Sequence, residues 1–237
     1  MLNELIKPPF LGFEPDALKF LKSLSFPKNN NKAWFDIHRE EYESFLKKPM
    51  RDLIDNLAVE INKIDPDIVV NYKSIFRINR DIRFSKIKTP YKTHYAAAFA
   101  FGRIKSAEIP QFYFHFSSKE FIFATGQYST ETDNLKKIRN KIYTDFKNFK
   151  SIINKSDFKK IYKNILGESL AKLPKGYENI STGNEDPLLF KTLMMKQFYV
   201  EKIYDPTIVL SEKVIDILLE NINRTYDFTK YLSEAIK

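Results

Sequence analysis

The spacing of hydrophobic residues changes in the middle of this chain, and that change limits the possible folds more than any other feature. Between residues 93 and 125, large apolar side chains fall on every second position in three short runs. Alternation of this kind is typical of strands with one buried face. On both sides of this region, apolar residues recur every three or four positions, as they do in helices. We therefore predict an α+β fold, with an antiparallel meander around residues 93–125 flanked by N-terminal and C-terminal helices.

The first alternating run, Thr93 to Phe101, also suggests what covers it. Its large residues share one face, whereas His94 and three alanines share the other. A face of small side chains lets a helix approach closely, or forms the floor of a cleft. The second and third runs, 111–116 and 121–125, are joined by a tight connection.

Proline and serine positions predict where several helices begin. Pro15 and Pro49 each precede a helical apolar stripe, and proline is tolerated in the first turn because its missing N–H has no partner there. A further helix is predicted over Lys32–Lys47. Ser211 is a suitable N-cap for the last helix. The segment Leu193–Val200 fits both the helical and the strand period.

The charge of the chain is high but mostly dispersed. The 237 residues show no repeat, low-complexity tract or linker, so one domain over residues 1–237 is predicted. A formal net charge of +9 suggests an anionic partner. Scattered lysines usually form a solvated surface, however, whereas a nucleic-acid footprint is a clustered stripe. Only residues 73–92 are clustered in this way.

Several classes of site and location are excluded or disfavoured. The chain has no cysteine, which excludes disulfides, thiolate nucleophiles and cysteine-ligated zinc. His38, His94 and His115 share no short metal-ligand spacing, so no metal site is predicted, and the sequence leaves the cofactor unknown. The first residues lack a signal-peptide pattern, and no apolar run is long enough to cross a bilayer. We therefore expect a cytoplasmic protein with no membrane partner.

Residues 73–92, KSIFRINRDIRFSKIKTPYK, hold the clearest indication of function. Arg77, Arg80 and Arg83 lie close together in a chain that otherwise relies on lysine. Guanidinium binds carboxylate or phosphate through two parallel hydrogen bonds, whereas ammonium acts as a point charge. A local concentration of arginine therefore indicates that geometry matters here.

The conformation of this segment is left open by its pattern. Residues 75–84 fit neither period cleanly. Both a strand and a helix would bring at least two guanidiniums together, which is costly unless an anion or a carboxylate lies between them. Pro90 holds Thr89 extended and ends any helix there, so residues 85–94, SKIKTPYKTH, are predicted to form a loop that leads into the first strand of the meander.

Three interpretations of the arginines remain open. In the first, the arginines are internal struts, and Asp81 pairs with Arg80 or Arg83. In the second, the arginines form a site for a small phosphate- or carboxylate-bearing ligand. In the third, the arginines belong to a nucleic-acid surface, where Tyr91 and Phe84 stack on bases. The predicted ligand-binding residues of this segment are Arg77, Arg80, Arg83, Lys88, Tyr91 and Lys92.

Two residues near the segment are candidates for proton transfer. Asp81 and His94 carry the carboxylate and the imidazole that general acid–base catalysis most often uses. His115 alternates with phenylalanines and matters only if it lines the same cleft as His94. No nucleophile motif or glycine-rich phosphate loop is present. The sequence therefore leaves open whether the protein is an enzyme.

The run from Arg77 to Ser85, continued by Lys88 to Lys92, closely resembles the signature of an uncharacterised, largely bacterial family, domain of unknown function 2461. Residues elsewhere agree with the family in order: Phe20, Leu21, Leu24, Asn29, Asn30, Trp34, Phe35, Arg39, Tyr42, Pro49, Gly126, Leu135, Arg139 and Pro174–Gly176. The resemblance spans nearly the whole chain and implies one domain, but it implies no activity.

The resemblance adds two residues to the predicted site and questions two others. Arg39 and Arg139 are predicted to converge on the arginine segment from flanking helices. Ile87 stands where the family pattern has an acid, and Asp186 where it has a histidine, which argues against an acid–base or metal role at either position. The function is unknown from the sequence. The leading expectation is a small anionic ligand, and a nucleic-acid module or a structural protein is the alternative.

Overall fold

The structure is a computed structural model that describes residues 8–106, 108–129, 132–177, 180 and 186–237. Residues 1–7, on which part of the signal-peptide expectation rests, lie outside the described residues. The chain forms two compact units. Unit 1 comprises Met1–Ile104, Tyr113–Phe123 and Ile203–Asn221, and unit 2 comprises Lys105–Phe112, Ala124–Lys202 and Ile222–Lys237. The single domain predicted over residues 1–237 stays a prediction.

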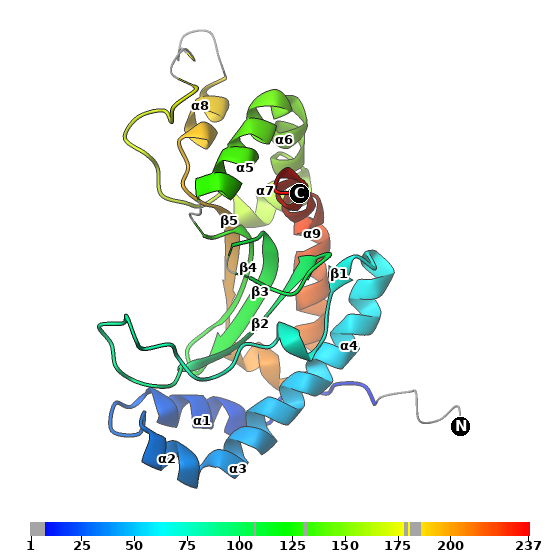
Figure 1. The fold of residues 1–237 in the computed structure, drawn as a ribbon. Helices are drawn as coiled ribbons and strands as arrows, with labels where there is room; N and C mark the ends of the chain where they lie inside the picture. Colours follow the sequence, from blue (N-terminus) through cyan, green and yellow to red (C-terminus); the bar gives the residue numbers. More distant parts are fainter. Residues whose placement is uncertain (1–7, 107, 130–131, 178–179, 181–185) are drawn as a thin grey trace. The chain divides into compact units, whose positions relative to one another are not determined.

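A five-stranded antiparallel sheet follows the order β1-β2-β3-β4-β5, so each strand pairs with its neighbour in sequence (Figure 1). The strands are β1 (Ile68–Val69), β2 (His94–Phe101), β3 (Gln111–Ser117), β4 (Phe121–Gln127) and β5 (Phe198–Tyr204). In the first pair, Ile68 lies opposite Phe101. The predicted α+β fold, a meander flanked by N-terminal and C-terminal helices, is confirmed.

Helices account for most of the remaining described chain. They are α1 (Pro15–Ser25), α2 (Lys32–Ile37), α3 (Arg39–Tyr42), the π-helical turn η1 (Glu43–Lys47), α4 (Lys48–Ile64), the 3-10 turn η2 (Tyr72–Ser74), α5 (Thr132–Thr144), α6 (Phe146–Ile153), α7 (Ser156–Tyr162), α8 (Pro187–Leu193), the 3-10 turn η3 (Pro206–Leu210) and α9 (Lys213–Ala235). None of the described helices combines the length and the apolar character needed to span a bilayer.

The continuous helix predicted over Lys32–Lys47 is wrong, because the helix breaks at His38. The backbone of His38 leaves the helical region, with φ −98° and ψ 21°. Its ring stacks on Trp34 at 3.9 Å between centroids, and its Nδ1 lies 2.8 Å from the Trp34 carbonyl oxygen. The helical hydrogen bonds around the break are kept, since the His38 amide also donates to the Trp34 carbonyl oxygen and the Tyr42 amide donates to that of His38, both at 3.1 Å.

The structure also sets the boundaries of two further segments. The region around Leu193–Val200 divides, since α8 ends at Leu193 and β5 begins at Phe198. The last helix begins at Lys213, two residues after the predicted N-cap. The Ser211 hydroxyl donates to the carbonyl oxygen of Ile208 at 3.5 Å, and its role as an N-cap stays a prediction.

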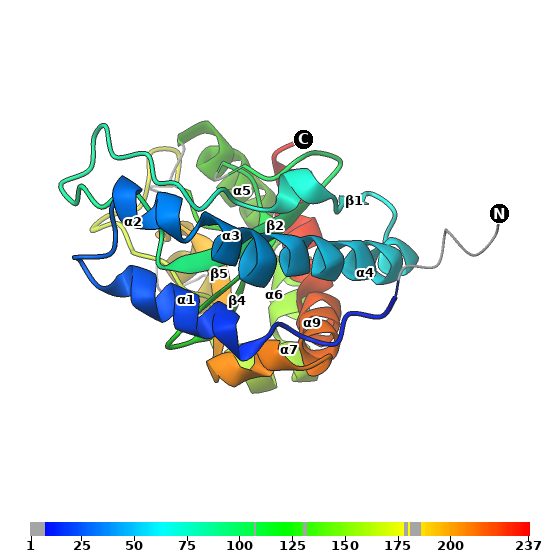
Figure 2. The ribbon, with the colours of Figure 1, turned by 90° about the horizontal axis from the view of Figure 1, so that it is seen from below.

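Aromatic side chains join the N-terminal helices of unit 1 to the sheet. Phe20 on α1 contacts Phe35 on α2 and Tyr42 on α3, and α1 lies beside these helices in both views (Figures 1 and 2). The hydroxyl of Tyr42 lies 3.3 Å from that of Tyr95 on β2. From Tyr95 to Phe101 every residue of β2 is buried, so the alanine face is covered as well as the aromatic one.

The core of unit 2 forms between α9 and the helices before it. Phe228 of α9 contacts Phe158 of α7 at 5.4 Å, and Tyr231 contacts Phe149 of α6 at 5.5 Å. Gly126 of β4 lies against β5 with φ +114°, and a β-carbon there would stand 2.1 Å from the Phe198 carbonyl oxygen. Only glycine therefore fits this position without displacing the neighbouring backbone.

We expect Gly126→Ala to destabilise the protein by roughly 3 kcal/mol or more, because positive φ and a backbone clash add. Gly102→Ala is the matched control, since Gly102 also has positive φ, at +65°, but open space where the β-carbon would be. The control should lose only about 1 kcal/mol, the cost of the left-handed conformation. Chemical denaturation followed by circular dichroism measures both, and equal losses would contradict the clash.

Candidate functional site

Residues 75–92 form an irregular hairpin in unit 1, which we call the arginine hairpin. An isolated bridge between Asn79 and Tyr91 joins its two arms, and a second bridge pairs Ile75 with Ala97 of β2. The Arg80 amide donates to the Pro90 carbonyl oxygen at 2.8 Å, and the Lys92 amide donates to that of Ile78 at the same distance. The segment is thus extended at its base, and it carries residues 81–89 as a tip (Figure 1).

The buried amide of Asn30 fastens this hairpin to the turn between α1 and α2. Its Oδ1 accepts from the Tyr91 backbone amide at 3.0 Å, and its Nδ2 donates to the carbonyl oxygens of Tyr91 and Leu24, both at 3.1 Å. The Tyr91 ring stacks on Phe35 at 4.1 Å between centroids. Tyr91, predicted to pack on a ligand, is therefore only 5% exposed and belongs to the core of unit 1.

The three arginines of the hairpin have different environments. Arg83 forms a two-pronged ion pair with Asp81, with hydrogen bonds of 3.0 and 2.7 Å, and this pairing lowers the pKa of Asp81. Arg77 is exposed. Arg80 is half-buried, and its guanidinium donates to the hydroxyls of Thr89 at 2.8 Å and Ser85 at 3.4 Å. Within the described part of the chain, Arg80 has no carboxylate within ion-pair distance.

The other predicted basic residues are distributed more widely. Lys92 and Lys88 each donate to a hairpin carbonyl, those of Arg77 and Ile82 respectively. Arg39 pairs with Asp36 at 2.5 Å and lies 5.6 Å from the centre of the Phe35 ring. Burial and Asp36 raise the pKa of Tyr91 and Arg39 opposes them, so Arg39 lies near the base of the hairpin.

Arg139 belongs to unit 2, whereas the arginine hairpin belongs to unit 1. It is buried on α5, and its guanidinium donates to the carbonyl oxygen of Met195 at 2.7 Å. Its described contacts thus brace α5 against the chain before β5. Convergence of Arg139 on the hairpin stays a prediction.

Two histidines meet on the sheet beside the hairpin base. The rings of His94 on β2 and His115 on β3 lie 4.7 Å apart between centroids. Burial lowers the pKa of each to about 4. His115, Lys92 and Arg80 lower the pKa of His94 further, whereas Glu120 opposes them. Both imidazoles are therefore neutral at physiological pH, in a region of positive potential.

Tyr113 is the hydrogen-bond partner of His115. The Nδ1 atom of His115 lies 3.1 Å from the Tyr113 hydroxyl, and either group can be the donor. The Nε2 atom lies 3.7 Å from the Glu120 carboxylate, beyond hydrogen-bond distance. Among the described residues, His94 has no hydrogen-bond partner for its ring, so its nitrogens can meet a ligand.

The sequence predicts His94 as a site residue but not His115, Tyr113 or Glu120. The alternation of side chains along a strand is the signal that could have found two of these, because His94, His115 and Tyr113 all occupy positions opposite the large apolar residues of their strands. Alternation shows that residues can share a sheet face, but it does not show which of them are neighbours. The register that brings His94 against His115 is a tertiary feature.

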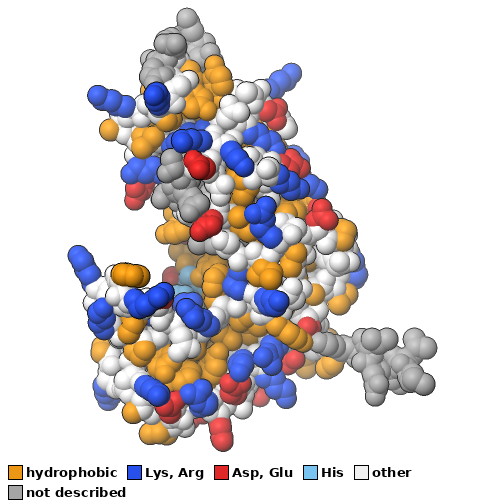
Figure 3. All heavy atoms as spheres, in the orientation of Figure 1, with side chains coloured by type: hydrophobic (Ala, Val, Ile, Leu, Met, Phe, Trp, Pro, Cys, Tyr) orange, Lys and Arg blue, Asp and Glu red, His pale blue; other side chains and the backbone are white. Residues whose placement is uncertain are grey.

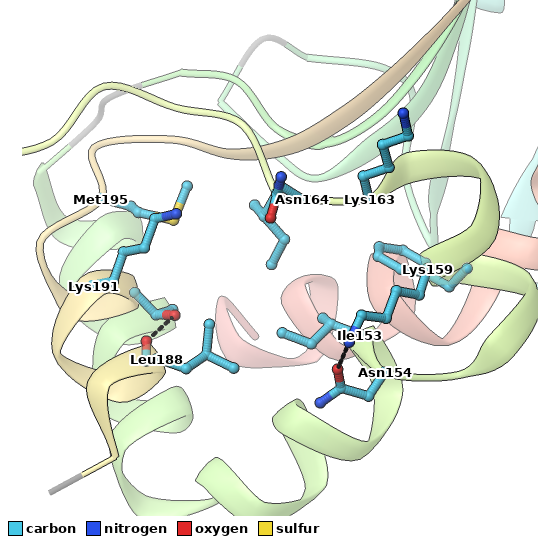
Figure 4. Close-up of a pocket in the computed structure, with 11 residues that line it drawn as sticks. Ile153, Asn154, Lys159, Lys163, Asn164, Leu188, Lys191 and Met195 are labelled. Atoms are coloured by element: carbon cyan, nitrogen blue, oxygen red, sulfur yellow. Dashed lines mark hydrogen bonds between the residues drawn. The ribbon is translucent and has the colours of Figure 1, made fainter.

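Unit 2 contains a separate cavity of about 180 Å³ (Figure 4). Ile153 and Leu188 contribute apolar surface. Three lysines also line the cavity: Lys159 of α7, Lys163 directly after α7, and Lys191 of α8. Lys163 points away from the cavity, and Lys159 donates to the Asn154 side chain at 3.2 Å (Figure 4). None of the sequence-predicted site residues lines it.

The two positions that depart from the family pattern have plain structural surroundings. Asp186 caps α8, accepting from the Leu188 amide at 2.9 Å, and its carboxylate also pairs with Lys150. Ile87 lies on the hairpin tip and is 61% exposed. Among the described residues, no group of three or more histidine, aspartate or glutamate side chains is arranged to hold a metal ion.

Comparison with protein families identifies the chain. The model of the family described as conserved hypothetical protein (DUF2461) matches residues 16–231. The chain belongs to this family. The match covers the arginine hairpin, both histidines of the pair and most of both units. Searches of the curated proteins and of the solved structures found no match.

We expect Asn30→Ala to destabilise the protein by roughly 2–4 kcal/mol, because it leaves the buried amide and carbonyl of Tyr91 without partners. Asn29→Ala is the matched control. The side-chain amide of Asn29 donates one hydrogen bond, to the Ser23 carbonyl oxygen at 2.9 Å. The Asn29→Ala substitution should therefore cost about 1 kcal/mol or less. Urea denaturation measures both, and a similar loss for the two variants would show that Asn30 does not fasten the hairpin.

The histidine pair predicts a specific pH dependence of stability. Each pKa is about 4 in the folded protein, against 6.5 for an unperturbed histidine. As the pH falls from about 6.5 to 4, the unfolded chain takes up protons that the folded chain does not, so stability falls. The loss should amount to a few kcal/mol for the pair, since one pKa unit corresponds to about 1.4 kcal/mol.

Denaturation between pH 6.5 and 4.5 measures this loss, and the His94→Gln/His115→Gln variant should flatten the slope. His38→Gln is the control and should keep it. Hydrogen bonds from Arg83 and Lys150 lower the pKa values of Asp81 and Asp186, so their contribution is lost only as the pH falls below the usual range of an aspartate. An unchanged slope in the double variant would contradict the neutral, buried state of the pair.

Proposed function

We propose that the protein binds a small anionic ligand, bearing phosphate or carboxylate, at the base of the arginine hairpin. The ligand-contacting residues in this proposal are Arg80, Lys92 and His94. The supporting observation is the state of Arg80: a half-buried guanidinium that is held by two hydroxyls and not by a carboxylate. The cytoplasmic location expected from the sequence belongs to this proposal.

Two cations lie near His94. Lys92 and Arg80 both lower the pKa of His94, beyond the effect of its burial, whereas Glu120 raises it. Positive charge thus gathers at a partly buried place where Glu120 is the opposing carboxylate. Such charge is unfavourable without a counter-ion, and an arriving anion supplies one. Guanidinium and imidazole also offer several directed donors, which suits the oxygens of phosphate or carboxylate.

The two alternatives account for different residues. The strut interpretation describes Arg83 and Arg39, whose ion pairs with Asp81 and Asp36 are exposed and contribute little stability. It does not describe Arg80. The nucleic-acid interpretation required Tyr91 and Phe84 to stack on bases, and Tyr91 is buried. His94 is the group through which a bound small ligand would exchange a proton, which makes it the first residue to test for chemistry.

A thermal-shift screen with inorganic phosphate, pyrophosphate, nucleotides, sugar phosphates and citrate tests the proposal. A ligand at a hundred times its dissociation constant should add about 2.7 kcal/mol of stability. Arg80→Gln should abolish the shift, whereas Arg83→Gln, whose guanidinium already pairs with Asp81, should retain it. If Arg83→Gln abolishes the shift as well, the ligand does not lie at the hairpin base, and if no anion shifts the protein, the proposal fails.

NMR of the imidazoles gives an independent readout. An anion bound against His94 stabilises its protonated form, so the pKa of His94 should rise from about 4 on adding the ligand. His38, stacked on Trp34 at the end of α2, serves as internal reference and should not respond. A ligand that shifts melting but leaves the His94 resonances unchanged would bind elsewhere.

A further inference from the structure

The most exposed large apolar side chain among those of the described residues lies at the tip of the arginine hairpin. Phe84 is 94% exposed, and Ile87, three positions later, is 61% exposed. Both lie among cations: Arg83 stands 5.8 Å from the centre of the Phe84 ring, and Lys86 and Lys88 are exposed beside them. Exposure of two neighbouring large apolar residues is unfavourable in water and indicates a partner surface.

We propose that this tip enters the interface of an anionic lipid bilayer, with Phe84 and Ile87 inserted and the basic side chains contacting the headgroups. This inference does not rest on the anion site at the hairpin base, because it uses other residues. It departs from the sequence-based expectation of no membrane partner. That expectation rested on the lack of a spanning segment, and interfacial insertion requires none.

The chemistry of the two side chains favours a bilayer over a nucleic acid. A single strand binds by stacking bases on aromatic faces, and of the two aromatic residues considered for that role Tyr91 is buried. The second exposed side chain at the tip, Ile87, is aliphatic and cannot stack, but it partitions into the acyl boundary as Phe84 does.

Shape and charge agree with this choice. The hairpin projects past α2 of the same unit in two perpendicular views (Figures 1 and 2). Basic side chains gather over it (Figure 3). A projecting tip with an apolar apex fits a flat surface, and lysines behind the apex keep their charges at headgroup level. Each basic residue near an anionic membrane adds to the attraction, which salt screens.

Sedimentation with vesicles of equal parts phosphatidylglycerol and phosphatidylcholine tests the proposal on the full chain. The protein should bind these vesicles at low salt, and it should bind much less to pure phosphatidylcholine or in about 0.5 M salt. Phe84→Ser and Ile87→Ser should each weaken binding, the former by about tenfold or more. Ile37→Ser, which removes an 80% exposed isoleucine from the end of α2, is the matched control and should have no effect.

Insertion depth provides a second measurement. Phe84→Trp adds a tryptophan to a chain that has only Trp34, so bromine-labelled lipids should quench the variant much more than the wild type. Thermal unfolding checks that all variants fold. We expect the tip variants to fold, because the substituted side chains are exposed. Arg80→Gln should retain vesicle binding, and Phe84→Ser should retain the anion shift, so the two proposals fail separately.

Three results would overturn the inference. The first is absence of binding to anionic vesicles at low salt. The second is vesicle binding that Phe84→Ser leaves unchanged, which would reduce the interaction to surface charge. The third is a short oligonucleotide whose affinity falls tenfold in Phe84→Ser while vesicle binding does not, which would assign the tip to nucleic acid.

Discussion

The candidate site depends on one buried amide. Asn30 bonds both the amide and the carbonyl of Tyr91, and so fixes the second arm of the arginine hairpin against the turn between α1 and α2. The stacking of Tyr91 on Phe35 fills the same contact with apolar surface. Backbone bridges then carry the position of Tyr91 to the opposite arm at Asn79. The place of Arg80 follows from these contacts, because Arg80 is the next residue along.

Charge in this region is arranged in two distinct ways. At the tip, Arg83 is neutralised by Asp81 and exposed to water, where an ion pair contributes little. At the base, Arg80 is held by hydroxyls, which orient its guanidinium without cancelling its charge. The histidine pair beside it remains neutral because burial lowers both pKa values, and neighbouring cations lower that of His94 further. A guanidinium that is held in a fixed orientation but keeps its charge is suited to bind an external anion.

Much of the fold could be predicted because its signals are local. The alternation of residues 93–125 and the helical stripes around it depend on neighbours a few positions away, and the sheet and helices formed there. The prediction of one continuous helix failed at His38, where the backbone leaves the helical region and the ring stacks on Trp34. For the candidate site, the arginine cluster was visible, but the pairing of His94 with His115 depends on strand register.

The sequence by itself determined where strands, helices and arginines lie along the chain, because periodicity and composition are properties of short segments. Only the tertiary structure decided what each charged or aromatic residue of the hairpin does. Tyr91 is buried and bonded to Asn30, 61 positions earlier in the chain, whereas Phe84 is exposed to water. Among the described residues, Arg83 has a carboxylate partner and Arg80 has none. Such differences arise from contacts between distant segments, and a local pattern does not encode them.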